Sequence, residues 1–160
     1  MIISIHQPSY LPWLPFIEKA IKSDIFVFLD DVQFEKNSEQ NRNKIKTSSG
    51  PSWLTIPVKR SLNSLISEVE IPQEQSKWVK KHINTIEQNY FKTPYYNDVI
   101  PELFDIIKSH NTNFMSLNIN IDEYFLSLAN FKGEIEFSSN LGIKKKKSNK
   151  ILSICKNLGA

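Results

Sequence analysis

A histidine and a pair of aspartates stand at the ends of two short apolar runs in this sequence. His6 follows the run at residues 2–5, and Asp30 and Asp31 follow the run at residues 25–29. In open parallel sheets, ligands bind beyond the carboxyl ends of the strands, so parallel strands would bring these groups to one edge. An imidazole beside a carboxylate could act as a general base or hold an amine or a ribose by hydrogen bonds. We therefore predict His6, Asp30 and Asp31 as catalytic residues. The alternative is a structural histidine and an acidic pair that opens a turn.

A second polar cluster surrounds Arg42, which is one of only two arginines in the chain. A guanidinium pairs with carboxylate or phosphate, and neighbouring amides add donors and acceptors. The alternative for this cluster is a solvated loop that leads into a strand. Aromatic side chains near His6 could stack on a sugar or a base, although burial in the core is their commoner role. The predicted substrate-binding residues are Gln7, Tyr10, Trp13, Gln33, Gln40, Asn41, Arg42, Asn43 and Lys46.

The lysine run at residues 144–147 leads into a predicted helix start at Ser148. Because helix N-termini attract anions, Lys147 and Ser148 form a weak candidate phosphate site, the alternative being a solvated charge run. The sequence contains no H-x-x-x-H, C-x-x-C or H-E-x-x-H motif, so no metal site is predicted. It also lacks G-x-G-x-x-G and Walker motifs, which excludes both glycine-dependent phosphate loops. The single cysteine, Cys155, is expected on the apolar side of the last helix.

The elements that would position these residues begin with a βαβ unit. Residues 2–5 and 25–29 are predicted strands, and residues 13–21 are a predicted helix with Pro12 in its first turn. Such a unit implies two parallel strands joined by a crossover helix. Residues 42–47 and 52–58 have strand-like compositions and flank a turn, which predicts a hairpin.

The rest of the chain is predicted to be mainly helical. We expect a short strand at residues 66–71, another at 133–137 and a last helix, capped by Ser148, that ends at Leu158. The three helices expected between those strands cover residues 76–91, 95–110 and 114–128. The fold class is therefore α/β, with a parallel Rossmann-like βαβ core, an inserted hairpin and a helical segment.

Length and composition favour one domain over residues 1–160. We divide it into a βαβ unit with hairpin (1–60), a helical segment (75–130), and a strand with the C-terminal helix (133–160). A helix followed by Leu-Gly-Ala usually leads into another strand, so we expect a C-terminal part to be missing. The chain is 40% hydrophobic, which excludes a disordered protein. No apolar stretch is long enough for a membrane span.

Charge and cysteine content bear on partners and compartment. The net charge is +3, but it becomes −1 without the lysine run, so a diffuse nucleic-acid surface is not indicated. The N-terminus lacks the basic region, apolar core and cleavage site of a signal peptide. A lone cysteine suits a reducing compartment, so we expect the cytoplasm.

Four motifs, in order, resemble the WbqC-like protein family. They are the segments His-Gln-Pro-Ser-Tyr-Leu-Pro-Trp (6–13), Asp-Asp-Val-Gln-Phe (30–34), Gln-Asn-Arg-Asn (40–43) and Trp-Leu-Thr-Ile-Pro-Val (53–58). Members of this family are typically longer than this chain, and they are associated with gene clusters for O-antigen and other surface polysaccharides. Some are described as glycine or other acyl transferases that act on amino-sugar building blocks.

The resemblance implies a transferase that attaches an acyl or aminoacyl group, such as glycyl, to an amino sugar. Its partners would be a nucleotide sugar or amino sugar and an activated donor, which could be a charged tRNA, with no other cofactor expected. In that mechanism His6 would take a proton from the amine, and Asp30 or Asp31 would orient the imidazole or the sugar. Arg42 would hold a phosphate, and Asn41 and Asn43 would donate to the oxyanion.

Two other function classes remain open from the sequence. A nucleotide-dependent ligase or nucleotidyl transferase would release pyrophosphate, and the histidine near a helix start faintly favours it. A non-catalytic nucleotide-sugar-binding protein would bind the same ligand without turnover.

Overall fold

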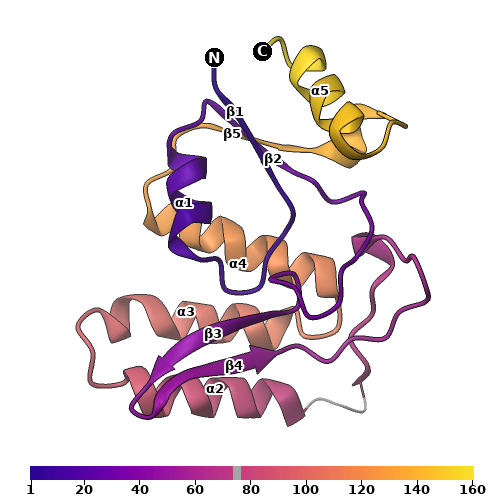
Figure 1. Ribbon diagram of the computed structural model, residues 1–160. Coiled ribbons are helices and arrows are strands. Elements are labelled where there is room, and N and C mark those ends of the chain that lie inside the picture. The colour runs from indigo at the N-terminus through magenta and orange to yellow at the C-terminus, as the bar shows by residue number, and fades with distance from the viewer. Residues whose placement is uncertain (74–76) are drawn as a thin grey trace.

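The parallel sheet that the βαβ pattern predicts is present in the computed structural model, which describes residues 1–73 and 77–160. The strand order is β1 (Ile3–His6), β2 (Ile25–Phe28) and β5 (Glu134–Phe137), and both neighbouring pairs are parallel. Helix α1 (Leu14–Ile21) connects β1 to β2. Figure 1 shows α4 on one side of this sheet and α5 on the other. The predicted α/β class with a parallel core is therefore confirmed.

The central strand β2 is apolar because both of its faces are covered. Phe26, Val27 and Phe28 are fully buried, as expected for a strand inside a parallel sheet. Phe16 and Ala20 of α1 pack in the same cluster as Phe26 and Phe28. This packing fixes the end of β1, and with it His6, next to the end of β2.

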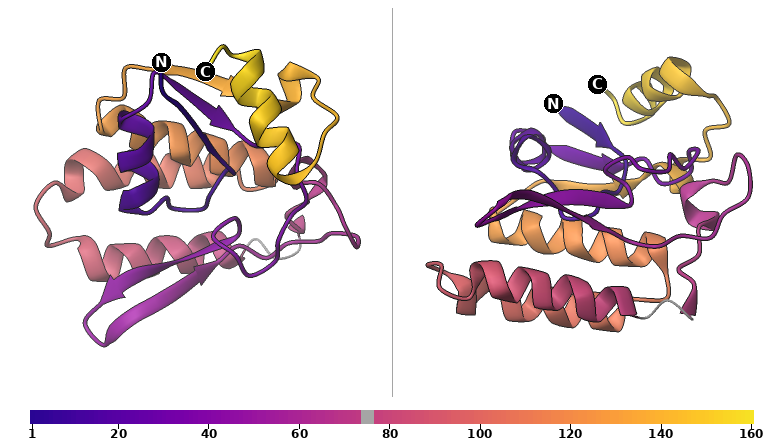
Figure 2. Two further views of the ribbon diagram at one scale, coloured as in Figure 1. Left: turned by 45° about the horizontal axis from the view of Figure 1, so that its top comes forward. Right: turned by 60° about the horizontal axis from the view of Figure 1, so that its bottom comes forward.

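The predicted hairpin is confirmed and lies apart from the parallel sheet (Figures 1 and 2). Strands β3 (Arg42–Thr47) and β4 (Gly50–Thr55) are antiparallel, with Thr47 opposite Gly50. Gly50 has φ +110°, a conformation that a side chain would strain, which fits glycine at the end of this tight turn. The second strand lies earlier in the chain than the predicted 52–58.

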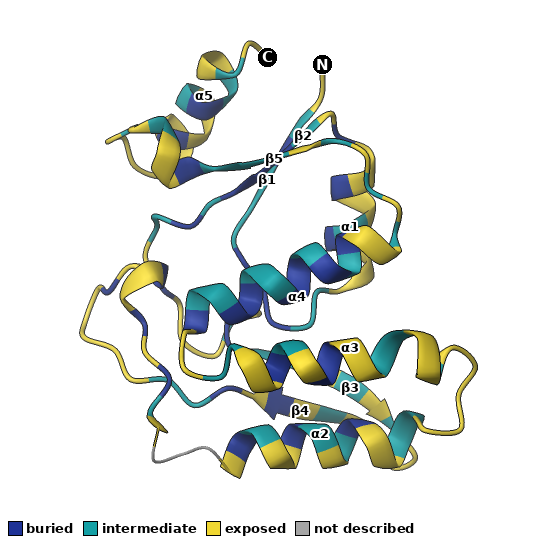
Figure 3. Cartoon of the chain, turned by 180° about the vertical axis from the view of Figure 1, so that it is seen from behind, coloured by how far each residue is buried: buried dark blue, intermediate teal, exposed yellow. Residues whose placement is uncertain are grey.

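The helical segment consists of α2 (Lys77–Tyr90), α3 (Tyr96–Ser109) and α4 (Phe114–Leu128), as predicted, except that residue 76 lies outside the described residues. Helix α4 is buried over much of its surface (Figure 3). Its Leu117 and Ile121 belong to the larger core, together with Trp78 and Leu103. Its Leu126 packs instead in the cluster beneath the parallel sheet. Helix α4 therefore joins the two apolar clusters.

Four local predictions are wrong. The segment predicted as a strand at 66–71 is a 3₁₀ turn, η1 (Ile66–Glu68), because the Glu68 carboxylate accepts from the Leu65 amide (2.8 Å) and closes the turn. Helix α1 begins at Leu14 with Pro15, not Pro12, in its first turn. Helix α5 (Lys147–Asn157) has Lys146 at its N-cap, so Ser148 does not cap it.

The fourth wrong prediction concerns the last helix, where Cys155 is only half-buried and Ile154 fills the core instead. Within the described residues, none of the helices combines the length and the apolar character needed to cross a membrane.

Candidate functional site

His6 and the two aspartates lie at the same edge of the sheet. His6 is the last residue of β1 and pairs with Phe28, and Asp30 and Asp31 follow β2 within three residues. Because the strands are parallel, both carboxyl ends open at this edge, where α/β proteins commonly bind ligands.

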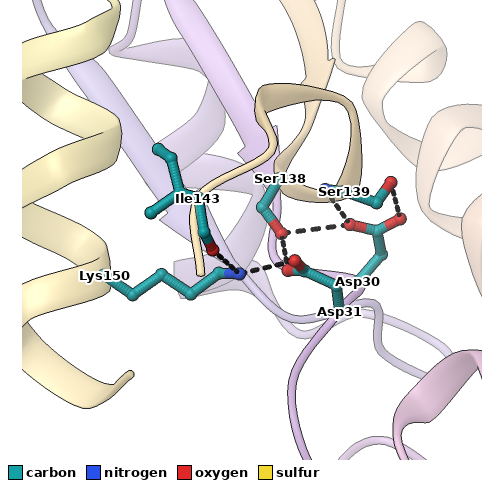
Figure 4. Close-up of polar contacts among 6 residues, drawn as sticks. All are labelled: Asp30, Asp31, Ser138, Ser139, Ile143 and Lys150. Carbon is teal, nitrogen blue, oxygen red and sulfur yellow. Dashed lines mark hydrogen bonds and ion pairs between the residues drawn. The ribbon is translucent and has the colours of Figure 1, made fainter. Parts of the chain in front are cut away.

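The carboxylates point toward residues of the C-terminal segment (Figure 4). Asp30 is buried and accepts from the Ser139 amide (2.9 Å), the Ser139 hydroxyl (2.7 Å) and the Ser138 hydroxyl (3.0 Å). Asp31 accepts from the Ser138 hydroxyl and forms an ion pair with Lys150 (2.5 Å). Ser138 and Ser139 belong to η3 (Ser138–Leu141), directly after β5. These contacts fasten the C-terminal segment to the sheet, and no hydrogen bond joins His6 to either aspartate among the described residues.

The Asp31–Lys150 pair is partly shielded from solvent, since the Lys150 side chain is 6% exposed and that of Asp31 is 27% exposed. Burial alone would raise the pKa of Asp31. The hydrogen bonds from Lys150 and Ser138 outweigh burial and hold that pKa below its ordinary value of 3.8.

We expect Asp31→Asn to lower the free energy of unfolding near neutral pH by about 1 kcal/mol. A depressed carboxyl pKa stabilises the fold above 3.8, and that contribution is lost as the pH falls through the folded-state value. The difference between wild type and variant should therefore vanish at the acid end of a urea-unfolding series. Asp105→Asn is the control, because its pair with Lys108 (3.4 Å) is exposed. Equal effects of both substitutions at every pH would contradict the assignment.

His6 lines a cavity of about 340 Å³ with residues of two loops. The lining residues besides His6 are Gln7, Pro8, Ser9, Ser38, Glu39 and Gln40. The His6 Nδ1 lies 2.8 Å from the Gln7 carbonyl oxygen, which can only accept, so Nδ1 carries the proton. This tautomer leaves the lone pair of Nε2 available as a base.

The surroundings of His6 keep the imidazole neutral. Burial lowers its pKa below 6.5, and nearby Lys19 lowers it further, while the Gln7 hydrogen bond and Glu39 oppose the shift without cancelling it. The ring also packs edge-on against Phe16, with centroids 4.9 Å apart. A neutral, oriented histidine in a polar cavity is suited to general-base catalysis.

Both walls of the His6 cavity are attached to α4. The buried carboxylate of Asp122 accepts from the Ser9 amide (2.9 Å) and the Ser9 hydroxyl (3.1 Å). Asn118 Nδ2, one turn earlier, donates to the Gln40 carbonyl (2.7 Å). The Gln40 side chain in turn donates to Gln7 Oε1 (2.9 Å), so the two loops are also joined to each other. Burial raises the pKa of Asp122 well above its ordinary value, although the bonds from Ser9 oppose the shift.

Sequence reasoning missed Asn118 and Asp122, yet a signal was present. Two polar residues stand four positions apart, and so on one face, in the largely apolar segment at 114–128. Ser138, Ser139 and Lys150 were also missed, because nothing local marks them as partners of an acidic pair more than 100 positions earlier.

The amides of the Gln-Asn-Arg-Asn segment bond mainly to the backbone. Gln40 and Asn41 are buried, and their side-chain oxygens accept from the amides of Glu35 (3.0 Å) and Asn37 (2.9 Å). Asn41 Nδ2 donates to the Ile56 carbonyl (3.1 Å). Asn43 Nδ2 donates likewise to the Leu11 carbonyl (2.7 Å). Asn41 and Asn43 each bond a backbone carbonyl and do not line the His6 cavity, so they shape the loop and hairpin.

Arg42 lies on the hairpin, with its guanidinium 4.3 Å from the Trp53 ring centroid. Its Nε is buried and has no hydrogen-bond partner among the described residues. Lys46 is exposed on the same strand, and its amide donates to the Tyr90 hydroxyl (3.1 Å).

The remaining predicted residues lie apart from the His6 cavity. Tyr10 is fully buried, and its hydroxyl pairs with His82 Nδ1 (2.7 Å), so its ring is not a stacking surface. Trp13 is exposed at the start of α1, and Gln33 donates to Asn63 (3.1 Å) near the surface. Lys147 and Ser148 are exposed in the first turn of α5. Residues 1–73 and 77–160 contain no cluster of His, Cys, Asp or Glu that could hold a metal ion.

Comparison with known proteins places the motifs in a family. A sequence model of the WbqC-like protein family matches residues 7–160. The chain is also 27% identical over 161 residues to the uncharacterized protein Rv1507c of Mycobacterium tuberculosis (strain ATCC 25618 / H37Rv), covering 99% of this chain and 69% of that protein. No solved structure matches this chain.

Proposed function

Because the chain belongs to the WbqC-like protein family, we propose that it is a transferase that attaches an acyl or aminoacyl group, glycyl among them, to an amino sugar. The acceptor is a nucleotide-activated amino sugar of surface polysaccharide biosynthesis in the cytoplasm. The observation that supports the proposal most is that His6 lines a cavity, while the bond of its Nδ1 to the Gln7 carbonyl leaves the Nε2 lone pair available as a base.

In the proposed reaction the sugar amine attacks the carbonyl carbon of an activated donor, such as an aminoacyl-tRNA or a thioester. His6 Nε2 takes the amine proton as the C–N bond forms, and then returns it to the departing oxygen or sulfur as the donor bond breaks. The side-chain nitrogen Nε2 of Gln7 donates to none of the described residues. Gln7 lines the cavity, and this nitrogen supplies a hydrogen bond to the developing oxyanion. Asn41 and Asn43 have no part in this step, because neither lines the His6 cavity.

The proposal is tested by incubating the protein with UDP- and dTDP-linked amino sugars, each with glycyl-tRNA or an acyl thioester. Mass spectrometry should show the sugar nucleotide gaining the mass of the acyl group. Absence of that gain with every donor, while circular dichroism shows a folded protein, would count against a transferase. Pyrophosphate release from ATP would indicate a ligase instead, and sugar-nucleotide binding without turnover would indicate a binding protein.

A further inference from the structure

A second cavity, of about 440 Å³, lies between β4 and the first half of α2, apart from the His6 cavity. Two tryptophans, Trp53 of the hairpin and Trp78 of α2, contribute to its lining. The other lining residues from α2 are Lys77, Lys81 and His82. Cavities of this size accommodate small-molecule ligands, which are usually bound by aromatic surfaces with a few fixed polar groups. Figure 1 shows β4 beside α2.

The charged residues that the structure describes at this cleft are all basic. Lys77 and Lys81 stand one helical turn apart, a spacing at which like charges destabilise a helix slightly. Arg42 and Lys44 lie over the Trp53 ring, 4.3 Å and 4.8 Å from its centroid. Within residues 1–73 and 77–160, no acidic residue lines the cleft and no ion pair includes any of these four cations. An anion bound here would therefore meet several cations that form no ion pair within the described part of the chain.

The aromatic wall is held in place before any ligand arrives. Trp78 packs edge-on against His82, with ring centroids 5.0 Å apart, and His82 Nδ1 pairs with the Tyr10 hydroxyl (2.7 Å). Burial, together with the charge of Lys81, lowers the pKa of His82 to about 4 against an opposing hydrogen bond with the Thr55 backbone, so this ring is uncharged near pH 7. Trp53 is 46% exposed, which leaves much of a large apolar side chain facing solvent. A planar ligand can contact the part of the indole that Arg42 and Lys44 leave exposed.

We propose that this cleft binds a nucleoside diphosphate, with the ring system of the nucleotide against Trp53 and the diphosphate beside Lys81 and Lys77. Lysines recognise phosphate as point charges, and the Arg42 guanidinium over the Trp53 ring adds positive potential beside them. This inference does not depend on the proposed transferase activity, because the binding of UDP to this cleft can be measured whether or not the protein transfers an acyl group.

Calorimetric titration of the whole protein with UDP, uridine and inorganic pyrophosphate measures how much each part of the ligand contributes to binding. UDP should bind about tenfold more tightly than either uridine or inorganic pyrophosphate, since each fragment contacts only the aromatic or only the basic groups. Equal affinity for pyrophosphate and UDP would overturn the role of the tryptophans. Failure of UDP to bind at about 5 mM would overturn the site itself, as would a clear preference for a single-stranded oligonucleotide.

Matched substitutions locate the site. Lys81→Gln should weaken UDP binding about tenfold, whereas Lys80→Gln, an exposed neighbour on the same helix that does not line the cleft, should leave it within about twofold. Trp53→Ala should weaken it by a similar factor, with Phe91→Ala as its control. Phe91 is an exposed aromatic residue (54%) just after α2, and it does not line the cleft. Equal effects within either pair would overturn the assignment.

Discussion

Replacing His6 with asparagine should reduce kcat/KM for acyl transfer by about 100-fold or more, the usual contribution of a general base. Asparagine can still donate to the Gln7 carbonyl, as Nδ1 of His6 does, so the loop keeps its anchor while the basic nitrogen is lost. His6→Ala should lower turnover to the same extent. Turnover is followed by mass spectrometry of the acylated sugar nucleotide.

The pH profile distinguishes loss of a base from loss of structure. The wild-type rate should fall as the pH drops through the pKa of His6, which burial places below 6.5, because only the neutral imidazole accepts a proton. The residual activity of the His6 variants should lack this limb. His110→Asn is the control, since His110 contacts Ser116 (3.2 Å) and does not line the cavity. Activity within about twofold of wild type in His6→Asn would remove His6 from the mechanism.

Asn118→Asp should lower the free energy of unfolding by about 3 kcal/mol or more near neutral pH, although the two side chains have almost the same shape. Asn118 is fully buried, and its Nδ2 is the donor to the Gln40 carbonyl. Aspartate would remove this donor and place a second carboxyl one turn from Asp122. Chemical denaturation gives the free energy directly.

The sign of the pH effect sharpens the test. Burial would raise the folded-state pKa of the introduced carboxyl above about 3.9. The part of the destabilisation that comes from ionisation is therefore absent below that value, where the protonated carboxyl can itself donate to the Gln40 carbonyl, and it grows as the pH rises. Asn120→Asp is the matched control, because Asn120 is half-buried and donates to the Ser116 carbonyl (2.8 Å) and hydroxyl (3.3 Å) of its own helix. Similar losses in the two variants would show that Asn118 does not hold the loop.

The local periodicity of the sequence accounts for most elements of the fold. The apolar run before Asp30 and the helical spacing through α4 predict those elements closely, because each depends on neighbouring residues alone. The pairing of β5 with β2 depends instead on contacts across more than 100 positions, which no local pattern encodes. The turn at η1 departs from the predicted strand because one side chain, that of Glu68, caps it.

The sequence predicts which residues stand at the strand ends, but not the contacts that their side chains make. The position of His6 at the sheet edge follows from strand order alone. The direction of the Asp30 carboxylate does not follow from strand order, because it depends on a hydrogen bond from Ser139, more than 100 positions later in the sequence. The hairpin asparagines have the chemistry of oxyanion donors, but nearby backbone carbonyls compete for the same hydrogens, and only the folded geometry decides between them.

The position of α4 between the two apolar clusters has a consequence for unfolding. Since Leu117 and Leu126 belong to different clusters but to one continuous helix, disruption of either cluster removes packing from α4, on which the other cluster also depends. We therefore expect heating to produce one cooperative transition, with tryptophan fluorescence and circular dichroism changing at the same temperature.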